Sequence, residues 1–237
     1  MTTVRRRPAM LAAGTAALAV FAVCVHAAAS ERSERVDTRG YRLAPPGSVG
    51  GMPQKRSFGD TYVGVVDCDG QPSDADCHQA QTEVWGIGIT PRDAHRIIAG
   101  ATGTGADYRR GEPGAVGSRY LAFRGLQGPV PDPEAALRRM VLSISRDEQP
   151  VFGDYGVRWA GPFRPFPLSG YDRAVMECRQ GEYRHTSVYD GSVTRIPRSL
   201  CVWADRGTVA ATESNVSVRE LAKLTAELHR TARVKGK

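Results

Sequence analysis

The chain has 237 residues, 41% of them hydrophobic and 24% charged, with a formal net charge of +7. Arg5, Arg6 and Arg7 supply three of these charges, so that the chain from Ser30 onward carries +4. The other arginines are scattered without interleaved aromatic residues or a groove-reading motif, which argues against nucleic acid as a partner.

A basic and then apolar segment opens the chain. After the three arginines, the run 9–29 has His26 as its one strongly polar side chain. As a helix rising about 1.5 Å per residue, this run is long enough to cross a hydrocarbon core of about 30 Å. It is also rich in alanine, and 27–29 offers the small-x-small pattern that signal peptidase cleaves. We predict that 1–29 is a signal peptide or signal-anchor helix. The chain is then exported, either secreted after cleavage near Ala29 or held as a single-pass membrane protein.

The cysteine count predicts disulfides. Cys24 lies in the export segment behind Val23, where lipidation would require a small residue. An even number of cysteines remains, which in an oxidising compartment is typical of two bridges: Cys68, Cys77, Cys178 and Cys201. Three pairings are conceivable, and nearness in sequence favours Cys68–Cys77 and Cys178–Cys201. A zinc site that adds His78 to the first pair is disfavoured, because no paired ligand motif completes it.

The segment 30–60 is polar and rich in Gly, Pro and Arg, and we interpret it as a linker. The extracytoplasmic domain is predicted over 61–237. Strands are expected at 62–66 and 84–89, on either side of a polar loop. Four carboxylates of that loop are of the type that calcium prefers: Asp67, Asp69, Asp74 and Asp76. Their spacing departs from the EF-hand pattern, so a solvated acidic loop is favoured over a calcium site.

The middle of the chain contains two helix signals around a strand. Pro91 suits a first helical turn and precedes apolar residues at helical spacing. The glycine-rich segment 101–118 is predicted to be a loop, and 119–125 a strand. Asp132 and Pro133 mark a clearer helix start, as a cap followed by a residue whose missing N–H costs nothing. The apolar face of that helix is formed by Leu137, Met140, Val141 and Ile144.

The second half is predicted to be mainly strand. A stretch rich in Phe and Pro, 161–167, is expected to be irregular, and 171–179 to be a strand. The long β run 199–212 places Cys201 and Trp203 on one side, so that the indole can pack on the bridge.

A final helix follows. Ser217 and Glu220 form a capping box, in which each side chain satisfies the other's free backbone N–H. The predicted core face of this helix comprises Val218, Leu221, Leu224 and Leu228, and its basic tail contains Arg230, Arg233 and Lys235. Together these elements predict an α+β domain, an antiparallel sheet covered by two principal helices and stabilised by disulfides.

Four stretches of the chain have a familiar character: Tyr41-Arg42-Leu43-Ala44-Pro45-Pro46 with Gly50-Gly51, Asp132-Pro133-Glu134-Ala135-Ala136, Cys201-Val202-Trp203-Ala204-Asp205 with Thr208-Val209, and Leu221-Ala222-Lys223-Leu224-Thr225 through Arg233-Val234-Lys235. They resemble a group of uncharacterised actinobacterial exported proteins. The resemblance implies one N-terminal membrane segment and an outward-facing domain. It carries over no catalytic or binding residue.

Candidate catalytic residues are few. Asp205 beside Trp203 could be a desolvated acid, although a packed indole followed by a turn at 205–207 is favoured. No Gly-x-Ser-x-Gly motif occurs. A catalytic triad would have to assemble in three dimensions, since the histidines are isolated in sequence: His78, His95, His185 and His229. The sequence therefore predicts no catalytic, cofactor-binding or metal-binding residue and no cofactor.

Export, bridges and the lack of catalytic motifs favour a non-enzymatic binding or interaction domain of the cell envelope, whose partner is an envelope protein, a cell-wall polymer or a small signal molecule. The membrane is a further partner if the N-terminal segment stays uncleaved. One alternative is an extracytoplasmic hydrolase that uses Asp205 or a histidine. A second is the sensor domain of a regulatory pair.

Overall fold

The computed structural model describes residues 35–62, 89, 91–112, 115–146, 156–186 and 189–235. Val36–Lys237 is one compact unit, apart from Met1–Arg35. The export segment, the Cys68–Cys77 pair with its acidic loop, and most of the strands predicted at 62–66 and 84–89 lie outside the described residues. Among the helices that are described, none combines the length and the apolar character needed to span a bilayer.

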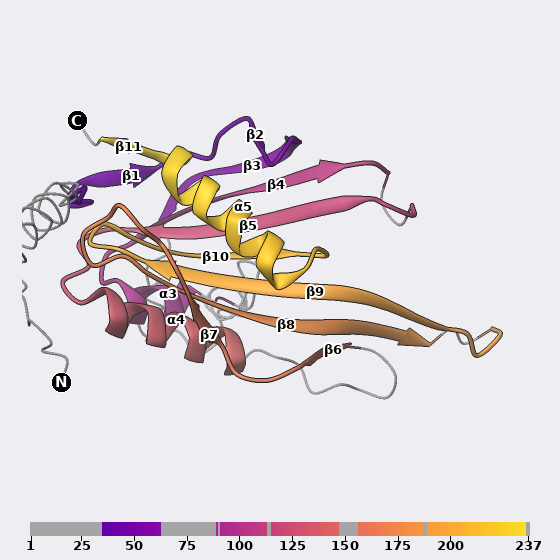
Figure 1. The fold of residues 1–237 in the computed structure, drawn as a ribbon. Helices are drawn as coiled ribbons and strands as arrows, with labels where there is room; N and C mark the ends of the chain where they lie inside the picture. Colours follow the sequence, from indigo (N-terminus) through magenta and orange to yellow (C-terminus); the bar gives the residue numbers. More distant parts are fainter. Residues whose placement is uncertain are drawn as a thin grey trace, which may run out of the picture. The chain divides into compact units, whose positions relative to one another are not determined.

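The unit is built mainly of antiparallel sheet (Figure 1). Its nine-stranded sheet has the order β2-β3-β4-β5-β10-β9-β8-β6, and β7 also pairs with β8. The strands are β2 (Ser48–Val49), β3 (Met52–Tyr62), β4 (Thr102–Arg110), β5 (Arg119–Gln127), β6 (Gly156–Trp159), β7 (Arg164–Phe166), β8 (Val175–Thr186), β9 (Val193–Ala204) and β10 (Thr208–Ser214). Two further strands, β1 (Tyr41–Leu43) and β11 (Arg233–Lys235), form a separate antiparallel ribbon.

Helices cover both faces of the sheet (Figure 1). The described residues contain α3 (Pro91–Ile97), α4 (Pro133–Arg146) and α5 (Val218–Thr231). On β9, Cys201 and Trp203 belong to the core cluster under α5, whereas Leu200, Val202 and Ala204 belong to the cluster under α3 and α4. Because successive side chains of a strand point to opposite faces, a strand covered on both sides is apolar throughout. This accounts for the uninterrupted apolar run at the end of β9.

The fold agrees with the predicted class, an antiparallel sheet with helices and a disulfide. Helices α4 and α5 have 14 residues each, and the shorter α3 packs beside α4. Helix α4 begins as predicted, with the Asp132 carboxylate accepting the Ala135 N–H at 3.0 Å. The predicted core face of α5 is correct, since Leu221, Leu224 and Leu228 are buried.

The predicted loop at 101–118 is wrong in its first half, because Thr102–Arg110 is strand β4. Glycine is needed there for close packing. A Cβ atom on Gly105 would lie 2.5 Å from the Phe123 carbonyl oxygen and 2.9 Å from Cδ of Arg124. The Arg124 side chain crosses this glycine and reaches Asp107, with Nη1 2.9 Å from Oδ1. The glycines that suggested a mobile segment thus allow a buried arginine to lie flat on the strand.

The linker predicted at 30–60 is also wrong beyond Arg35, since β1, β2 and most of β3 fall within it. Strands β2 and β3 lie at and next to an edge of the large sheet, where few side chains need burial, and β1 belongs to the separate ribbon. Val49 and Met52 are fully buried, while Lys55, Arg56 and Ser57 are exposed. Their polar composition therefore resembled that of a linker.

Three smaller boundaries differ from prediction. The stretch 161–167 is not wholly irregular, because β7 pairs with β8 there. The strand expected from Tyr171 begins at Val175, and the β run 199–212 is broken at Asp205 into β9 and β10. The capping box is half formed: Ser217 Oγ accepts the Glu220 N–H at 3.3 Å, but the Glu220 carboxylate binds Arg119.

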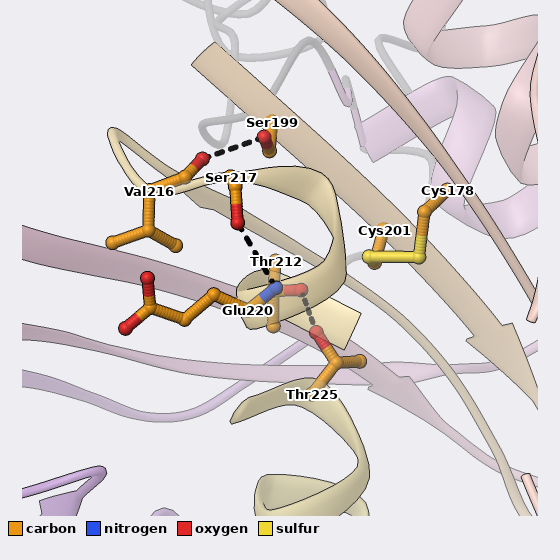
Figure 2. Close-up of a disulfide and its surroundings, with 8 residues drawn as sticks. All are labelled: Cys178, Ser199, Cys201, Thr212, Val216, Ser217, Glu220 and Thr225. Atoms are coloured by element: carbon orange, nitrogen blue, oxygen red, sulfur yellow. Dashed lines mark hydrogen bonds between the residues drawn. A yellow bond between two sulfur atoms is a disulfide. The ribbon is translucent and has the colours of Figure 1, made fainter. Parts of the chain in front are cut away.

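The disulfide Cys178–Cys201 is formed as predicted. It joins residues directly opposite one another on β8 and β9, on the face that α5 covers (Figure 2). Beside it, a hydrogen bond of 2.6 Å between the Thr212 and Thr225 hydroxyls connects β10 to α5. A disulfide is typical of an oxidising, extracytoplasmic compartment.

The variant Cys178→Ala/Cys201→Ala should lose about 3 kcal/mol of unfolding free energy, because the bridge closes a loop of 23 residues in the unfolded chain. Chemical denaturation of the oxidised proteins measures this. The variant Val116→Ala, at a fully exposed turn, is the control. A double variant that unfolds at the midpoint of the control would contradict the prediction.

Candidate functional site

The tight connection between β9 and β10 is built around the Asp205 carboxylate. Its Oδ1 accepts the backbone N–H groups of Gly207 and Thr208 at 2.8 and 2.9 Å. The Asp205 N–H in turn donates to the Thr208 carbonyl at 2.9 Å. The predicted turn at 205–207 is therefore confirmed, and its aspartate is completely buried.

The second carboxylate oxygen meets His229, in the last turn of α5. Asp205 Oδ2 lies 3.0 Å from His229 Nε2, and His229 Nδ1 lies 2.7 Å from Nη2 of Arg233. A guanidinium can only donate, so Nδ1 must be the acceptor. The network thus assigns the proton to Nε2, which donates to Asp205, and His229 is neutral.

Arg233 completes the network. Its Nε donates to the His229 carbonyl at 2.6 Å, and its Nη1 lies 3.5 Å from Asp205 Oδ2. The guanidinium also lies 3.9 Å from the ring centre of Tyr171, a cation–π contact. The sequence assigned Arg233 to the basic tail of the last helix. Instead it begins β11 with a side chain that is 5% exposed, because the buried carboxylate needs a cation.

Burial and charge set the ionisation of this network. Burial alone would raise the pKa of Asp205, but the hydrogen bonds from His229 and Gly207 and the charge of Arg233 bring that pKa below its ordinary value. Burial lowers the pKa of His229, and the charge of Arg233 adds to this, while Asp205 opposes it. The cluster therefore holds one anion, one cation and a neutral imidazole.

Asp205, His229 and Arg233 together form a structural clamp and not a catalytic site. A catalytic histidine uses one ring nitrogen for its aspartate and presents the other to a nucleophile or substrate. Here the second nitrogen is occupied by Arg233, and both Asp205 and His229 are 0% exposed. The clamp ties the β9–β10 turn to α5 and β11.

The sequence reasoning missed the pairing of Asp205 with His229, which are 24 residues apart. One signal was present. His229 stands four residues after Thr225 and eight after Leu221, which places all three on one helical face. All three are fully buried.

The other candidate residues named from the sequence are Trp203 and the remaining histidines. Of these, Trp203 contacts the clamp through the His229 ring. Trp203 is buried, stacks on Phe123 with ring centres 5.6 Å apart, and points its indole N–H at Thr208 Oγ1, 3.4 Å away. The packing interpretation of Trp203 is thus confirmed. His95 is exposed on α3, His185 belongs to β8, and His78 lies outside the described residues.

A cavity of about 780 Å³ is lined in part by residues 206 and 207 of the same turn. Four segments line it. They are 39–42, which includes part of β1, Gly100 and Thr102 around the start of β4, the segment 127–131 from the end of β5, and the turn residues 206–207. At its wall, the Gln127 side chain accepts the Leu43 N–H at 2.7 Å and donates to Thr102 Oγ1 at 2.8 Å. The cavity wall is therefore built from segments far apart in the sequence.

Arginines dominate the charge of this cavity. Of the described residues that line it, three are arginines and none is acidic. Arg39 binds Asp37 through Nε at 2.7 Å, which holds the pKa of that carboxyl below its usual range. Arg206 Nε lies 2.9 Å from Asp172 Oδ2. The exposed Arg42 forms no ion pair or side-chain hydrogen bond with the described residues.

Comparisons with known proteins give no match: no family model, no curated protein and no solved structure is significantly similar to this chain. Among the described residues, no three His, Cys, Asp or Glu side chains are grouped so that they could hold a metal ion.

The clamp should make stability depend on pH through His229. Folding lowers the pKa of this imidazole. As the pH falls below about 6.5, His229 therefore becomes protonated in the unfolded chain while it stays neutral in the folded chain. Unfolding free energy should then decrease with falling pH, by at most about 1.4 kcal/mol per pH unit from this group. Denaturation between pH 7 and 5 should show a flatter dependence for His229→Gln than for the wild-type chain.

The matched control is His95→Gln, at an exposed position of α3. It should retain the wild-type dependence. Equal slopes for the two variants would contradict the assignment of a neutral, buried His229.

Proposed function

We propose that this chain is an exported binding domain of the cell envelope, and that it binds a small molecule in the cavity beside the Asp205 turn. The observation that carries the proposal is the cavity itself, whose volume of about 780 Å³ lies within the range of about 300–1,000 Å³ typical of small-molecule sites. Its lining combines an apolar part, from Tyr41 and the segment 129–131, with a few polar groups.

The lining favours binding over turnover. Among the described residues that line the cavity there is no histidine, cysteine, carboxylate or lysine that could serve as a base toward the hydroxyl groups of Tyr41 and Thr102. The one carboxylate of the adjoining turn, on Asp205, is buried, and it is occupied by three hydrogen bonds and the ion pair with Arg233. A hydrolase built on Asp205 and His229 finds no support in this geometry.

The walls are held before any ligand arrives. The Gly207 carbonyl accepts the Gly128 N–H at 3.0 Å, and the Arg206 carbonyl accepts the Val130 N–H at 3.1 Å. The Arg206 N–H donates to Thr38 Oγ1 at 2.9 Å. A site whose segments are already joined loses little conformational freedom on binding, which favours affinity. The Cys178–Cys201 bridge supports an extracytoplasmic location for this site.

Filling the cavity should abolish binding. Pro129 and Pro131 line it and are exposed, and neither has a backbone N–H to lose, so Pro129→Trp/Pro131→Trp adds two indoles at the cavity with little effect on the sheet. Native mass spectrometry of the oxidised full chain, incubated with the small-molecule fraction of an envelope extract, should detect a bound mass for the wild type and none for this variant.

The control Val116→Trp adds an indole at a fully exposed turn and should bind like the wild type. If the wild-type chain acquires no mass, or if the double variant acquires the same mass, the cavity is not the binding site and the proposal fails.

A further inference from the structure

We propose that the ligand of this cavity is a small organic anion, a carboxylate or phosphate on an apolar body, and that Arg42 is its charge anchor. This inference rests on the proposed function and adds the chemical class of the ligand. It is carried by the balance of charges around the cavity and by the contrast between Arg42 and the two other arginines there.

Two of the three arginines are already neutralised. Arg39 donates its Nε to Asp37 Oδ2 and its backbone N–H to Oδ1 of the same carboxylate, at 2.7 and 3.1 Å. Arg206 faces Asp172 at 2.9 Å. These two ion pairs fix the positions of their guanidinium groups at the rim and contribute no net charge.

Arg42 is the uncompensated cation of the lining. No carboxylate lines the cavity beside it in the described part of the chain. A ligand that carries positive charge would meet the uncompensated guanidinium group of Arg42 and no carboxylate among the described lining residues. A ligand with one negative charge would leave the cavity close to neutral, as complementary sites are.

The backbone fixes the direction of Arg42. It is the central residue of β1, paired with Val234 of β11. The next residue, Leu43, is 4% exposed and packs against the sheet, where a Cβ atom on Gly125 would come within 2.4 Å of it. Strand alternation then sends Arg42 to the opposite side, away from the core. The side chain is therefore presented by a rigid element rather than by a free loop.

The chemistry of the group selects the ligand. A guanidinium offers parallel N–H donors that match the oxygen pairs of carboxylate and phosphate, and hydrogen bonds of this charged kind are about twice as strong as neutral ones. The segment 129–131, which also lines the cavity, can cover an apolar body. Together they define an amphipathic anion of small size.

The test uses four probes that share one ring and differ in their head group: phenyl phosphate, benzoate, benzamide and phenyltrimethylammonium. Binding to the oxidised full chain is measured by ligand-observed NMR and calorimetry at low salt. The two anions should bind, and at least tenfold more tightly than the neutral amide or the cation. Their affinity should fall as salt is added.

Arg42→Gln should weaken the binding of phenyl phosphate about tenfold or more, and should leave the benzamide signal unchanged. Arg42→Lys keeps the positive charge but lacks the parallel N–H donors of the guanidinium group, and should retain part of the affinity. The matched control is Arg110→Gln. It removes one exposed arginine from the far end of β4, roughly 26 Å along the strand from the lining residue Thr102, and should bind like the wild type.

Two outcomes would overturn the inference. If benzamide binds as tightly as phenyl phosphate, or if Arg42→Gln matches Arg110→Gln, the cavity does not select an anion through Arg42. The second outcome is that neither anion binds at concentrations up to about 10 mM, roughly ten times the 1 mM dissociation constant of a weak complex. The ligand is then not an anion of this class. In both cases a bound envelope molecule that is lost in Pro129→Trp/Pro131→Trp would preserve the proposed function.

Discussion

The fold of this unit depends on one buried carboxylate. Removing a charged aspartate from water is costly unless donors and an opposite charge replace the solvent. Asp205 meets this condition with two backbone N–H groups of its own turn, the imidazole of His229 and the guanidinium of Arg233. Those partners come from the β9–β10 connection, the end of α5 and the start of β11, so the requirement of a single side chain brings three parts of the chain together.

The same turn contributes both to the clamp and to the cavity wall. Its inner side satisfies the carboxylate, while its carbonyl groups at Arg206 and Gly207 accept hydrogen bonds from the segment after β5. A Cβ atom on Gly207 would lie 2.5 Å from the Thr38 carbonyl oxygen, so the segment that leads to β1 can approach only because this residue is glycine. The cavity wall is thus a product of the clamp, and its arginines are positioned by backbone that the clamp holds.

What could be predicted from sequence was local. The Asp132 cap, the apolar stripe of α5 and the Cys178–Cys201 pair each follow from residues close together in the chain. The strand β4 could not be recognised, because Gly105 is required by the Arg124 side chain that crosses it, and that contact is set by the pairing of β4 with β5. The union of Asp205, His229 and Arg233 could not be predicted either, since nothing local indicates which buried cation will meet which carboxylate. The cavity is formed by four separated segments, so no sequence motif marks it.

The ribbon of β1 and β11 has a mechanical consequence. Tyr41 is opposite Lys235, and Leu43 is opposite Arg233, so the two outermost residues of the ribbon are neighbours. A pull that separates Tyr41 from Lys235 loads these pairs one after another instead of loading them all together in shear. The rungs open from Tyr41 inward, and the last one reached bears the arginine that is locked to the buried carboxylate. The Leu43–Arg233 pair should therefore resist separation most, because the Arg233 guanidinium also pairs with the buried Asp205 carboxylate.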